Sequence, residues 1–142
     1  MKTARCLPVL GLVFALCACG VSQTVWLDET DLSVMKCGWG SPQAGKSVDG
    51  NALSVGGKSY KRGVGTHAVS TFLLNTDGRG KRFVASVGVD DETHSAAATV
   101  EFFVLGDRAL LWRSGILKMG DSARGVDLDI GGVKTITLGG KA

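Results

Sequence analysis

The chain has 142 residues, 44% of them hydrophobic, which is enough apolar material for the core of one domain and too little length for two ordinary domains. Its formal net charge is +3, but two basic residues, Lys2 and Arg5, lie in an N-terminal segment without acidic residues, and the remainder carries only +1. No cationic stripe remains for a phosphate backbone, so nucleic acid is excluded as a predicted partner.

The first predicted element is an export signal over residues 1–19. An uncharged run, Cys6 to Gly20, is too short for a comfortable membrane span. Its end, LCACG (residues 16–20), is similar to the lipobox of bacterial lipoproteins. We therefore expect an exported lipoprotein that is lipidated at Cys19 and reaches the membrane only through this lipid anchor. Cleavage after Ala18, which gives a plain secreted protein, is the alternative.

Residues 20–26 are predicted to be a short linker, and residues 27–142 to form the single folded domain. Cys6 and Cys17 leave with the signal, and lipidation occupies Cys19, so Cys37 remains alone and no disulfide framework is predicted. If Cys19 is not lipidated, a bridge between Cys19 and Cys37 stays open.

From Val25 onward the chain consists of short β-type runs broken by glycine, and nothing predicts a long helix. Residues 53–60 predict a tight hairpin around Gly56-Gly57, and residues 71–74 predict a continuous apolar strand. Residues 81–90 alternate, which predicts a half-buried strand. Its apolar face is formed by Phe83, Ala85, Val87 and Val89.

The C-terminal half predicts two further strand pairs. Residues 99–113 predict a hairpin with its turn at Gly106-Asp107. Residues 126–130 and 134–138 are expected to pair directly through a three-residue loop, because a two-residue loop would turn apolar residues of the second run outward. The expected partners are Leu128 with Ile136 and Val126 with Leu138. Many short strands with glycine turns predict an all-β fold, a β-sandwich or jelly roll.

The first candidate site is the run Gly63-Val64-Gly65-Thr66-His67-Ala68. Its glycines permit close backbone approaches, so that Thr66 and His67 can be held at a defined place on a loop. Trp39, between two glycines, offers a ring that can pack on sugar C–H groups while polar side chains bind the hydroxyls. On residue types alone, a hydrogen-bonded structural histidine is the simpler interpretation of this run.

The second candidate site is the acidic run Asp90-Asp91-Glu92. Asp90 and Asp91 can accept hydrogen bonds from sugar hydroxyls, and Asp91 and Glu92 can ligate Ca²⁺, which takes several oxygen ligands. A solvated acidic turn is the alternative without a ligand. A paired-carboxylate glycosidase is a further alternative, which the small size of the chain disfavours.

Several motifs stand in an order that resembles a known family. These motifs are Cys37-Gly-Trp-Gly40, residues 51–68, residues 83–92, residues 100–104, Ser114-Gly115 and residues 126–138. Together they resemble the NPCBM domain, which overlaps carbohydrate-binding module family 51, over about residues 27–140. The family's motif positions present here are Trp39, Gly65, Thr66, His67, Asp90, Asp91 and Glu92.

The resemblance implies a β-sandwich of jelly-roll type that is usually appended to glycoside hydrolases and holds them on galactose-containing or related glycans. It implies binding without catalysis. No cofactor is expected to be required, and an optional calcium ion at Asp91 and Glu92 is inferred from the acidic residues themselves, not from the resemblance. Because no hydrolase domain is attached, the implied partners are a galactose-type glycan and a separate glycoside hydrolase.

The chain departs from the family pattern at its C-terminal end. Family members usually continue past the strand that matches residues 135–138 into a last segment containing Asp-Trp-Ala, whereas this chain stops at Ala142. We therefore expect a sandwich without its C-terminal strand and with an open strand edge. The alternative function is a truncated or degenerate module that acts as a surface structural or protein-interaction domain.

Overall fold

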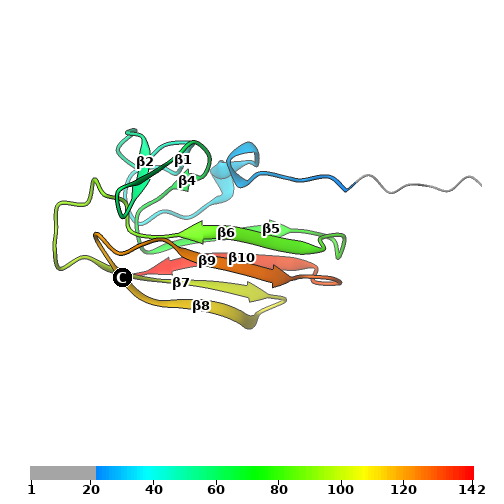
Figure 1. Cartoon of the computed structure of the whole chain (residues 1–142). Helices are drawn as coiled ribbons and strands as arrows, with labels where there is room; N and C mark the ends of the chain where they lie inside the picture. Colours follow the sequence, from blue (N-terminus) through cyan, green and yellow to red (C-terminus); the bar gives the residue numbers. More distant parts are fainter. Residues whose placement is uncertain (1–21) are drawn as a thin grey trace, which may run out of the picture.

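The computed structural model describes residues 22–142, and almost all regular elements in this range are β-strands (Figure 1). Two short 3-10 helices, η1 (Leu27–Glu29) and η2 (Leu32–Val34), come first. The strands are β1 (Gln43–Ala44), β2 (Leu53–Val55), β3 (Lys58–Tyr60), β4 (Val64–Gly65), β5 (Ser70–Asn75), β6 (Arg82–Val87), β7 (Thr99–Gly106), β8 (Ala109–Lys118), β9 (Arg124–Asp129) and β10 (Thr135–Lys141).

The predicted export signal at residues 1–19 and the lipidation at Cys19 lie outside the described residues. The described part of the predicted linker, residues 22–26, has no regular secondary structure. In the range from residue 22 to the end, no helix has the length and apolar character needed to cross a membrane.

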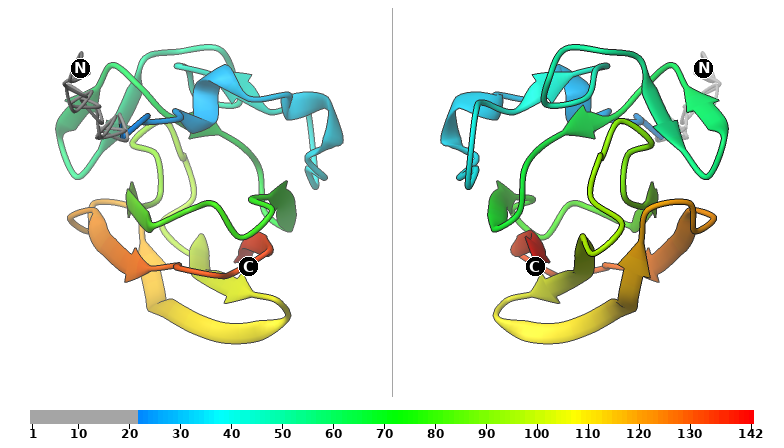
Figure 2. Two further views of the ribbon diagram at one scale, coloured as in Figure 1. Left: turned by 90° about the vertical axis from the view of Figure 1, so that its right-hand side faces the viewer. Right: turned by 90° about the vertical axis from the view of Figure 1, so that its left-hand side faces the viewer.

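Two antiparallel sheets pack face to face. Four strands form the larger sheet in the order β5–β10–β7–β8, and β6 pairs with β9 in the smaller one. Two short ladders, β1–β4 and β2–β3, gather with the 3-10 helices on one side of this pair of sheets (Figures 1 and 2). The predicted β-sandwich is confirmed.

The core lies between the two sheets. Val104 and Ile136 come from the larger sheet, Val126 comes from β9, and Ile130 follows β9 directly; all four are buried. Trp112, on β8, packs against this cluster and is partly buried. The four-stranded sheet therefore turns one face of each strand towards β6 and β9, which is the arrangement of a two-layer domain.

The register of β6 and β9 follows the alternation of the sequence. Phe83 lies opposite Leu128, and Ala85 lies opposite Val126, so the apolar residues of both strands face the core. The outward side chains of β6 are Arg82, Val84 and Ser86, and all are exposed. The prediction of a half-buried strand is confirmed for this segment.

Both predicted hairpins are present. β2 and β3 pair across Gly56-Gly57, and both glycines have positive φ angles, which a tight turn requires here. β7 and β8 pair across Asp107-Arg108, with irregularities in register along the ladder. The sequence thus located the first turn correctly and placed the second one residue too early, at Gly106-Asp107.

The predicted pairing of residues 126–130 with residues 134–138 is wrong. β9 pairs with β6, whereas β10 enters the other sheet between β5 and β7. A turn in which the Val133 N–H donates to the Ile130 carbonyl carries the chain from one sheet to the other. The Asp107 carboxylate accepts hydrogen bonds from the Lys134 and Thr135 N–H groups and fixes the start of β10. The apolar residues of both strands still share one core, because they face each other across the sandwich.

The last strand, β10, is central in the four-stranded sheet. It pairs with β5 along one side and with β7 along the other (Figure 1). β10 is therefore not an edge strand, because it has a partner strand on both sides. The larger sheet ends at β5 and β8.

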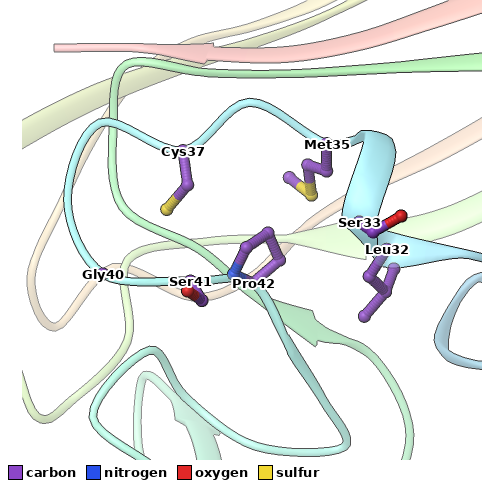
Figure 3. A pocket seen from close by; sticks show the side chains of 7 residues that line it. All are labelled: Leu32, Ser33, Met35, Cys37, Gly40, Ser41 and Pro42. Carbon is purple, nitrogen blue, oxygen red and sulfur yellow. The ribbon is translucent and has the colours of Figure 1, made fainter.

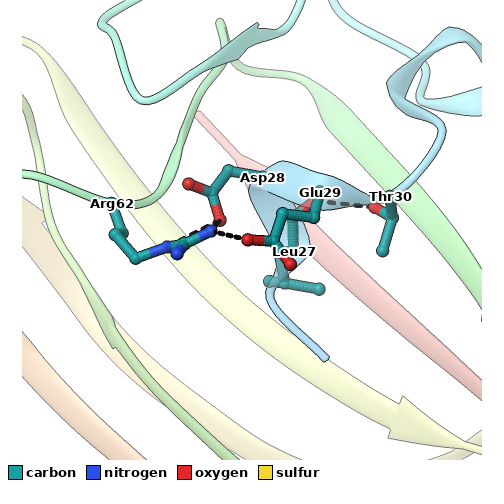
Figure 4. Close-up of polar contacts among 5 residues, drawn as sticks. All are labelled: Leu27, Asp28, Glu29, Thr30 and Arg62. Atoms are coloured by element: carbon teal, nitrogen blue, oxygen red, sulfur yellow. Dashed lines mark hydrogen bonds and ion pairs between the residues drawn. The ribbon is translucent and has the colours of Figure 1, made fainter. Parts of the chain in front are cut away.

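The N-terminal segment is attached through Arg62. Its guanidinium lies over the Trp26 ring, 4.5 Å from the ring centroid, and forms ion pairs with Asp28 and Glu29 (Figure 4). The carboxylates lie on η1, so one side chain joins the start of the domain to the segment just before β4.

Substitution of one buried and one exposed isoleucine tests whether the β10 side chains form part of the core. Ile136 is 2% exposed, and Ile136→Ala should reduce the free energy of unfolding by about 2–5 kcal/mol, because it leaves a cavity between the sheets. Ile116 on β8 is 69% exposed, and Ile116→Ala should cost less than about 1 kcal/mol. Urea unfolding measures both, and equal losses would contradict the core described here.

Candidate functional site

An exposed tryptophan and an exposed histidine lie side by side at the surface. The ring centroids of Trp39 and His67 are 6.0 Å apart, and the ring planes meet at 64°, an edge-to-face contact. Trp39 is 60% exposed, and His67 is exposed as well. The structure thus brings together two of the residues that the sequence proposed for one site.

Backbone hydrogen bonds hold the segment that carries Trp39 against the segment that carries His67. Lys36 and Thr71 exchange both of their N–H to carbonyl bonds, at 2.9 and 3.0 Å, which attaches the first segment to β5. The Gly38 N–H donates to the His67 carbonyl at 3.2 Å. Trp39 and His67 are therefore presented by two neighbouring segments that a backbone hydrogen bond joins.

The Cys37 thiol lies where these two segments meet. It donates a hydrogen bond to the Trp39 carbonyl at 2.9 Å. It accepts one from the Thr66 hydroxyl at 3.2 Å and one from the His67 N–H at 3.3 Å. Thr66, a predicted sugar contact, is partly buried and directs its hydroxyl to this sulfur atom. Its contribution in this structure is to position His67.

Two glycines make the close approach possible. A Cβ at Gly38 would lie 2.5 Å from the Ala68 carbonyl oxygen, and a Cβ at Gly65 would lie 2.2 Å from the Lys46 carbonyl oxygen. Both obstacles are backbone atoms, which cannot move aside as a side chain can. The glycines of the two motifs are therefore required by packing at these positions.

The imidazole of His67 has a defined hydrogen-bonding role. Its Nδ1 lies 2.6 Å from the Ala68 carbonyl oxygen. Because a carbonyl oxygen only accepts, Nδ1 carries the proton in this contact, and in the neutral ring Nε2 is then an acceptor. The ring thus offers one acceptor nitrogen next to the exposed indole.

The three acidic residues lie in the loop after β6, which ends at Val87 rather than at residue 90. Asp90 accepts hydrogen bonds from the Ser54 and Glu92 N–H groups. Asp91 accepts from the Gly56 and Gly57 N–H groups, each at 2.9 Å, and from the Ser54 hydroxyl. Asp90 and Asp91 therefore fasten the β2–β3 hairpin, and no contact joins them to the Trp39–His67 pair in the described part of the chain.

Glu92 is directed to a different loop, residues 46–51. Its carboxylate accepts hydrogen bonds from the Ser47 hydroxyl and from the Asn51 side-chain amide. Ser47 is buried and lies against Gly65 on the side of the histidine segment. Glu92 thus supports, through Ser47, the loop on which the His67 segment packs.

These hydrogen bonds change the acidity of two carboxyl groups. The Ser54 hydroxyl, together with the Gly57 and Gly56 N–H groups, holds the pKa of Asp91 below its ordinary value of 3.8. For Glu92, desolvation raises the pKa, but bonds from Ser47, Asn51 and Asp49 outweigh it and lower the pKa overall. Both groups are stabilised in their charged form by donors within the fold.

The two carboxylates of the predicted calcium site, Asp91 and Glu92, are already engaged as hydrogen-bond acceptors within the fold. Calcium takes about six to eight oxygen ligands. The two carboxylates instead accept hydrogen bonds from separate loops, and among residues 22–142 no group of three or more His, Cys, Asp or Glu side chains is placed to hold a metal ion. The acidic run acts as a set of internal acceptors.

A surface hollow adjoins the thiol. It has a volume of about 370 Å³, and Figure 3 shows the Cys37 and Met35 side chains directed into it. Leu32, Met35 and Pro42 supply apolar surface, and Ser33 and Ser41 supply hydroxyl groups. The hollow therefore combines apolar and hydroxyl-bearing side chains.

Cys37 and Ser47 are the structural residues of the site that sequence reasoning missed. The sequence predicts no hydrogen-bond partner for Cys37 and no role for Ser47. The signal for Cys37 was its place in the Cys-Gly-Trp-Gly motif. No sequence signal indicated the roles of Ser47 or Asn51, because their partner, Glu92, is more than forty residues away.

The chain is similar to known proteins over most of its length. The family described as NPCBM/NEW2 domain matches residues 23–141. A solved structure of the CBM51 module from Clostridium perfringens GH95 in complex with methyl-galactose has a TM-score of 0.75 and 31% sequence identity. That similarity covers 82% of this chain and 86% of the other.

Two curated relatives are much longer proteins. A protein of Renibacterium salmoninarum named "Putative endo-alpha-N-acetylgalactosaminidase" is 33% identical over 90 residues, which are 63% of this chain and 6% of that protein. Alpha-1,3-galactosidase B of Akkermansia muciniphila is 34% identical over 87 residues, which are 60% of this chain and 11% of that protein. The matched stretch is thus a small part of either relative.

The hydrogen bonds that the Asp91 carboxylate accepts from the β2–β3 hairpin, here called the Asp91 clamp, should make the stability of the fold depend on pH in the acidic range. Because the folded-state pKa of Asp91 is lowered from 3.8, its contribution is complete above that pH and is lost as the pH falls through the folded-state pKa. Asp91→Asn should therefore lower the Tm clearly at pH 7, and the difference from wild type should shrink below about pH 3.8.

Thermal melts between pH 7 and pH 2.5 or so provide this comparison. Asp49→Asn is the matched control, since Asp49 is exposed and its carboxylate accepts no hydrogen bond from the described residues. A Tm difference for Asp91→Asn that stays constant over the whole pH range would contradict the clamp.

Proposed function

The chain belongs to the NPCBM/NEW2 family, and from this premise we propose that it is a carbohydrate-binding module that holds a galactose-type sugar at Trp39 and His67. The observation that carries the proposal is the exposed indole next to an exposed imidazole on two segments that glycine packing holds in place. The similarity to a CBM51 module in complex with methyl-galactose supports the class of sugar.

The two side chains offer complementary chemistry for a pyranose. The exposed indole of Trp39 provides an apolar face for sugar C–H groups, which supplies contact area. His67 provides an Nε2 acceptor for a sugar hydroxyl, which supplies orientation. A sugar on these two groups has one stacked face and at least one directed hydrogen bond.

The site needs little rearrangement on binding. Its two segments are joined by the Cys37 thiol bonds and by the Gly38–His67 backbone bond before any sugar arrives. A preformed site avoids part of the ordering cost of association. The surface is nevertheless open and small, so a single sugar unit should bind weakly.

Binding without catalysis is part of the proposal. A glycosidase needs two carboxyl groups that exchange protons or attack the sugar. Asp90 and Asp91 accept hydrogen bonds from the β2–β3 hairpin, and Glu92 accepts them from Ser47 and Asn51. These internal bonds support a structural role for all three, and no cofactor enters the proposal.

The cellular setting belongs to the same proposal. The N-terminal segment with its lipobox-like end supports export and anchoring through Cys19. The curated relatives are named as enzymes that act on galactose-type sugars, which supports a separate glycoside hydrolase as the partner of this chain. In this arrangement the chain keeps a glycan close to the cell surface.

Removal of either ring should weaken sugar binding. Trp39→Ala should raise the Kd for methyl galactoside at least tenfold, or about 1.4 kcal/mol, because it removes the stacking face. His67→Ala should raise it several-fold through the loss of one acceptor. Isothermal titration calorimetry measures both effects.

Trp26→Ala is the matched control for the loss of an exposed tryptophan. Trp26 is 47% exposed and lies under Arg62, so its removal should leave the Kd unchanged. Absence of saccharide binding by the folded wild-type protein, or an equal loss in all three variants, would reject the proposed site.

The protein should show no hydrolytic activity. Incubation with nitrophenyl α- and β-galactosides should release no nitrophenol above the rate of the buffer, because Asp90 and Asp91 are engaged within the fold. Activity that disappears in Asp90→Asn or Asp91→Asn would show that the chain is a small glycosidase instead.

A further inference from the structure

We propose that the hollow beside Cys37 holds a second sugar unit of the glycan bound at Trp39 and His67, so that the chain recognises at least a disaccharide. This inference rests on the proposed function, which assigns the first unit to the Trp39–His67 pair. The ligand class is a neutral glycan of two or more linked pyranose units.

The lining of the hollow suits a pyranose ring. Leu32, Met35 and Pro42 provide an apolar wall for its C–H faces (Figure 3). Ser33 and Ser41 provide hydroxyl groups at the edge for its polar substituents. Ser33 Oγ already donates to Asp31 at 2.6 Å, so its oxygen is oriented as an acceptor for a sugar hydroxyl.

The volume of the hollow is appropriate for one further sugar unit. It measures about 370 Å³, near the lower end of the roughly 300–1,000 Å³ that small-molecule pockets occupy. A single pyranose is smaller than the drug-sized molecules that fill such pockets. The hollow is therefore large enough for one ring and too small for a long stretch of glycan.

The hollow lies next to the Trp39–His67 pair in the fold, because two of its lining residues contact or adjoin the pair. Cys37 lines the hollow and accepts the His67 N–H bond at 3.3 Å, and Gly40, directly after Trp39, also lines it. The hollow and the two rings are thus carried by neighbouring segments of the chain. Linked sugar units are adjacent in the same way, which favours a glycan over two independent small molecules.

The relative position of the two surfaces is fixed by the fold. The Lys36–Thr71 bridge anchors one wall to β5, and the backbone contact at Gly38 leaves no room for movement towards Ala68. Two subsites on a rigid frame add their contacts with little extra ordering cost. A disaccharide of the right linkage should therefore bind more tightly than one sugar unit.

Calorimetry with the full chain tests this inference. The probes are methyl galactoside and a set of galactose-terminated disaccharides that differ in linkage. At least one disaccharide should bind about tenfold more tightly than methyl galactoside. Ser41→Trp, which fills the hollow from an exposed position, should remove this advantage and leave the affinity for methyl galactoside unchanged.

Ser33→Trp fills the hollow from the opposite wall and serves if Ser41→Trp does not fold. Ser86→Trp, at an exposed position on the outer face of β6, is the control for an added indole and should change neither affinity. Circular dichroism and the Tm establish that each variant is folded.

The outcomes separate the two proposals. If methyl galactoside binds and no disaccharide binds more tightly, the second subsite is rejected and the proposed function stands. If a folded Ser41→Trp protein loses affinity for methyl galactoside and disaccharide equally, the hollow belongs to the first sugar unit and the inference is again rejected. If no saccharide binds to the wild-type protein, the proposed function fails first and the subsite fails with it.

Discussion

The site depends on one packing constraint, the contact of backbone with backbone at Gly38 and Gly65. At these two positions neighbouring carbonyl oxygens occupy the place of a side chain, so three loops approach more closely than any other residue would allow. The Cys37 thiol fills the remaining space with one donated and two accepted hydrogen bonds. An exposed tryptophan and an exposed histidine are thereby held beside each other. The proposed recognition surface is a consequence of main-chain packing.

Three carboxylates hold the loops next to this contact by accepting hydrogen bonds. Asp90, Asp91 and Glu92 follow one another in the chain, and each accepts hydrogen bonds from a different set of donors in the hairpin and in the loop of residues 46–51. Loops without strands of their own leave many N–H groups unpaired, and a charged acceptor is a strong partner for them. The same residues that suggested a ligand site by their charge therefore serve to keep irregular backbone in order. The tryptophan and the histidine remain as the groups that face outward.

Local patterns in the sequence predicted several strands, two hairpins and a sandwich or jelly roll, and the family resemblance implied the same fold. Alternation located β6, and glycine pairs or Gly-Asp located the β2–β3 and β7–β8 hairpins, because these features depend on neighbours in the chain. The partner of β10 was not predictable in this way, since Ile136 and Leu138 would face a core in either arrangement, and the choice between sheets is made by residues far away. The grouping of Trp39 with His67 followed from their motifs. The fastening of Asp91 to Gly56 and of Glu92 to Ser47 had no local signature, because contacts over more than thirty residues leave no pattern in one sequence.

The sandwich and the loop region around the site are stabilised by different interactions. The sandwich rests on buried aliphatic side chains between β6–β9 and the larger sheet, whereas the short ladders and loops around the site rest on hydrogen bonds to exposed or half-exposed carboxylates. Water can replace the hydrogen bonds to these carboxylates, whereas it is excluded from the contacts between the buried side chains. Stability in such a molecule is uneven, and hydrogen exchange should therefore resolve two cooperative units of different protection. The loop region that carries Trp39 and His67 is the part that opens at lower free energy, although its closed form holds the two rings in one arrangement.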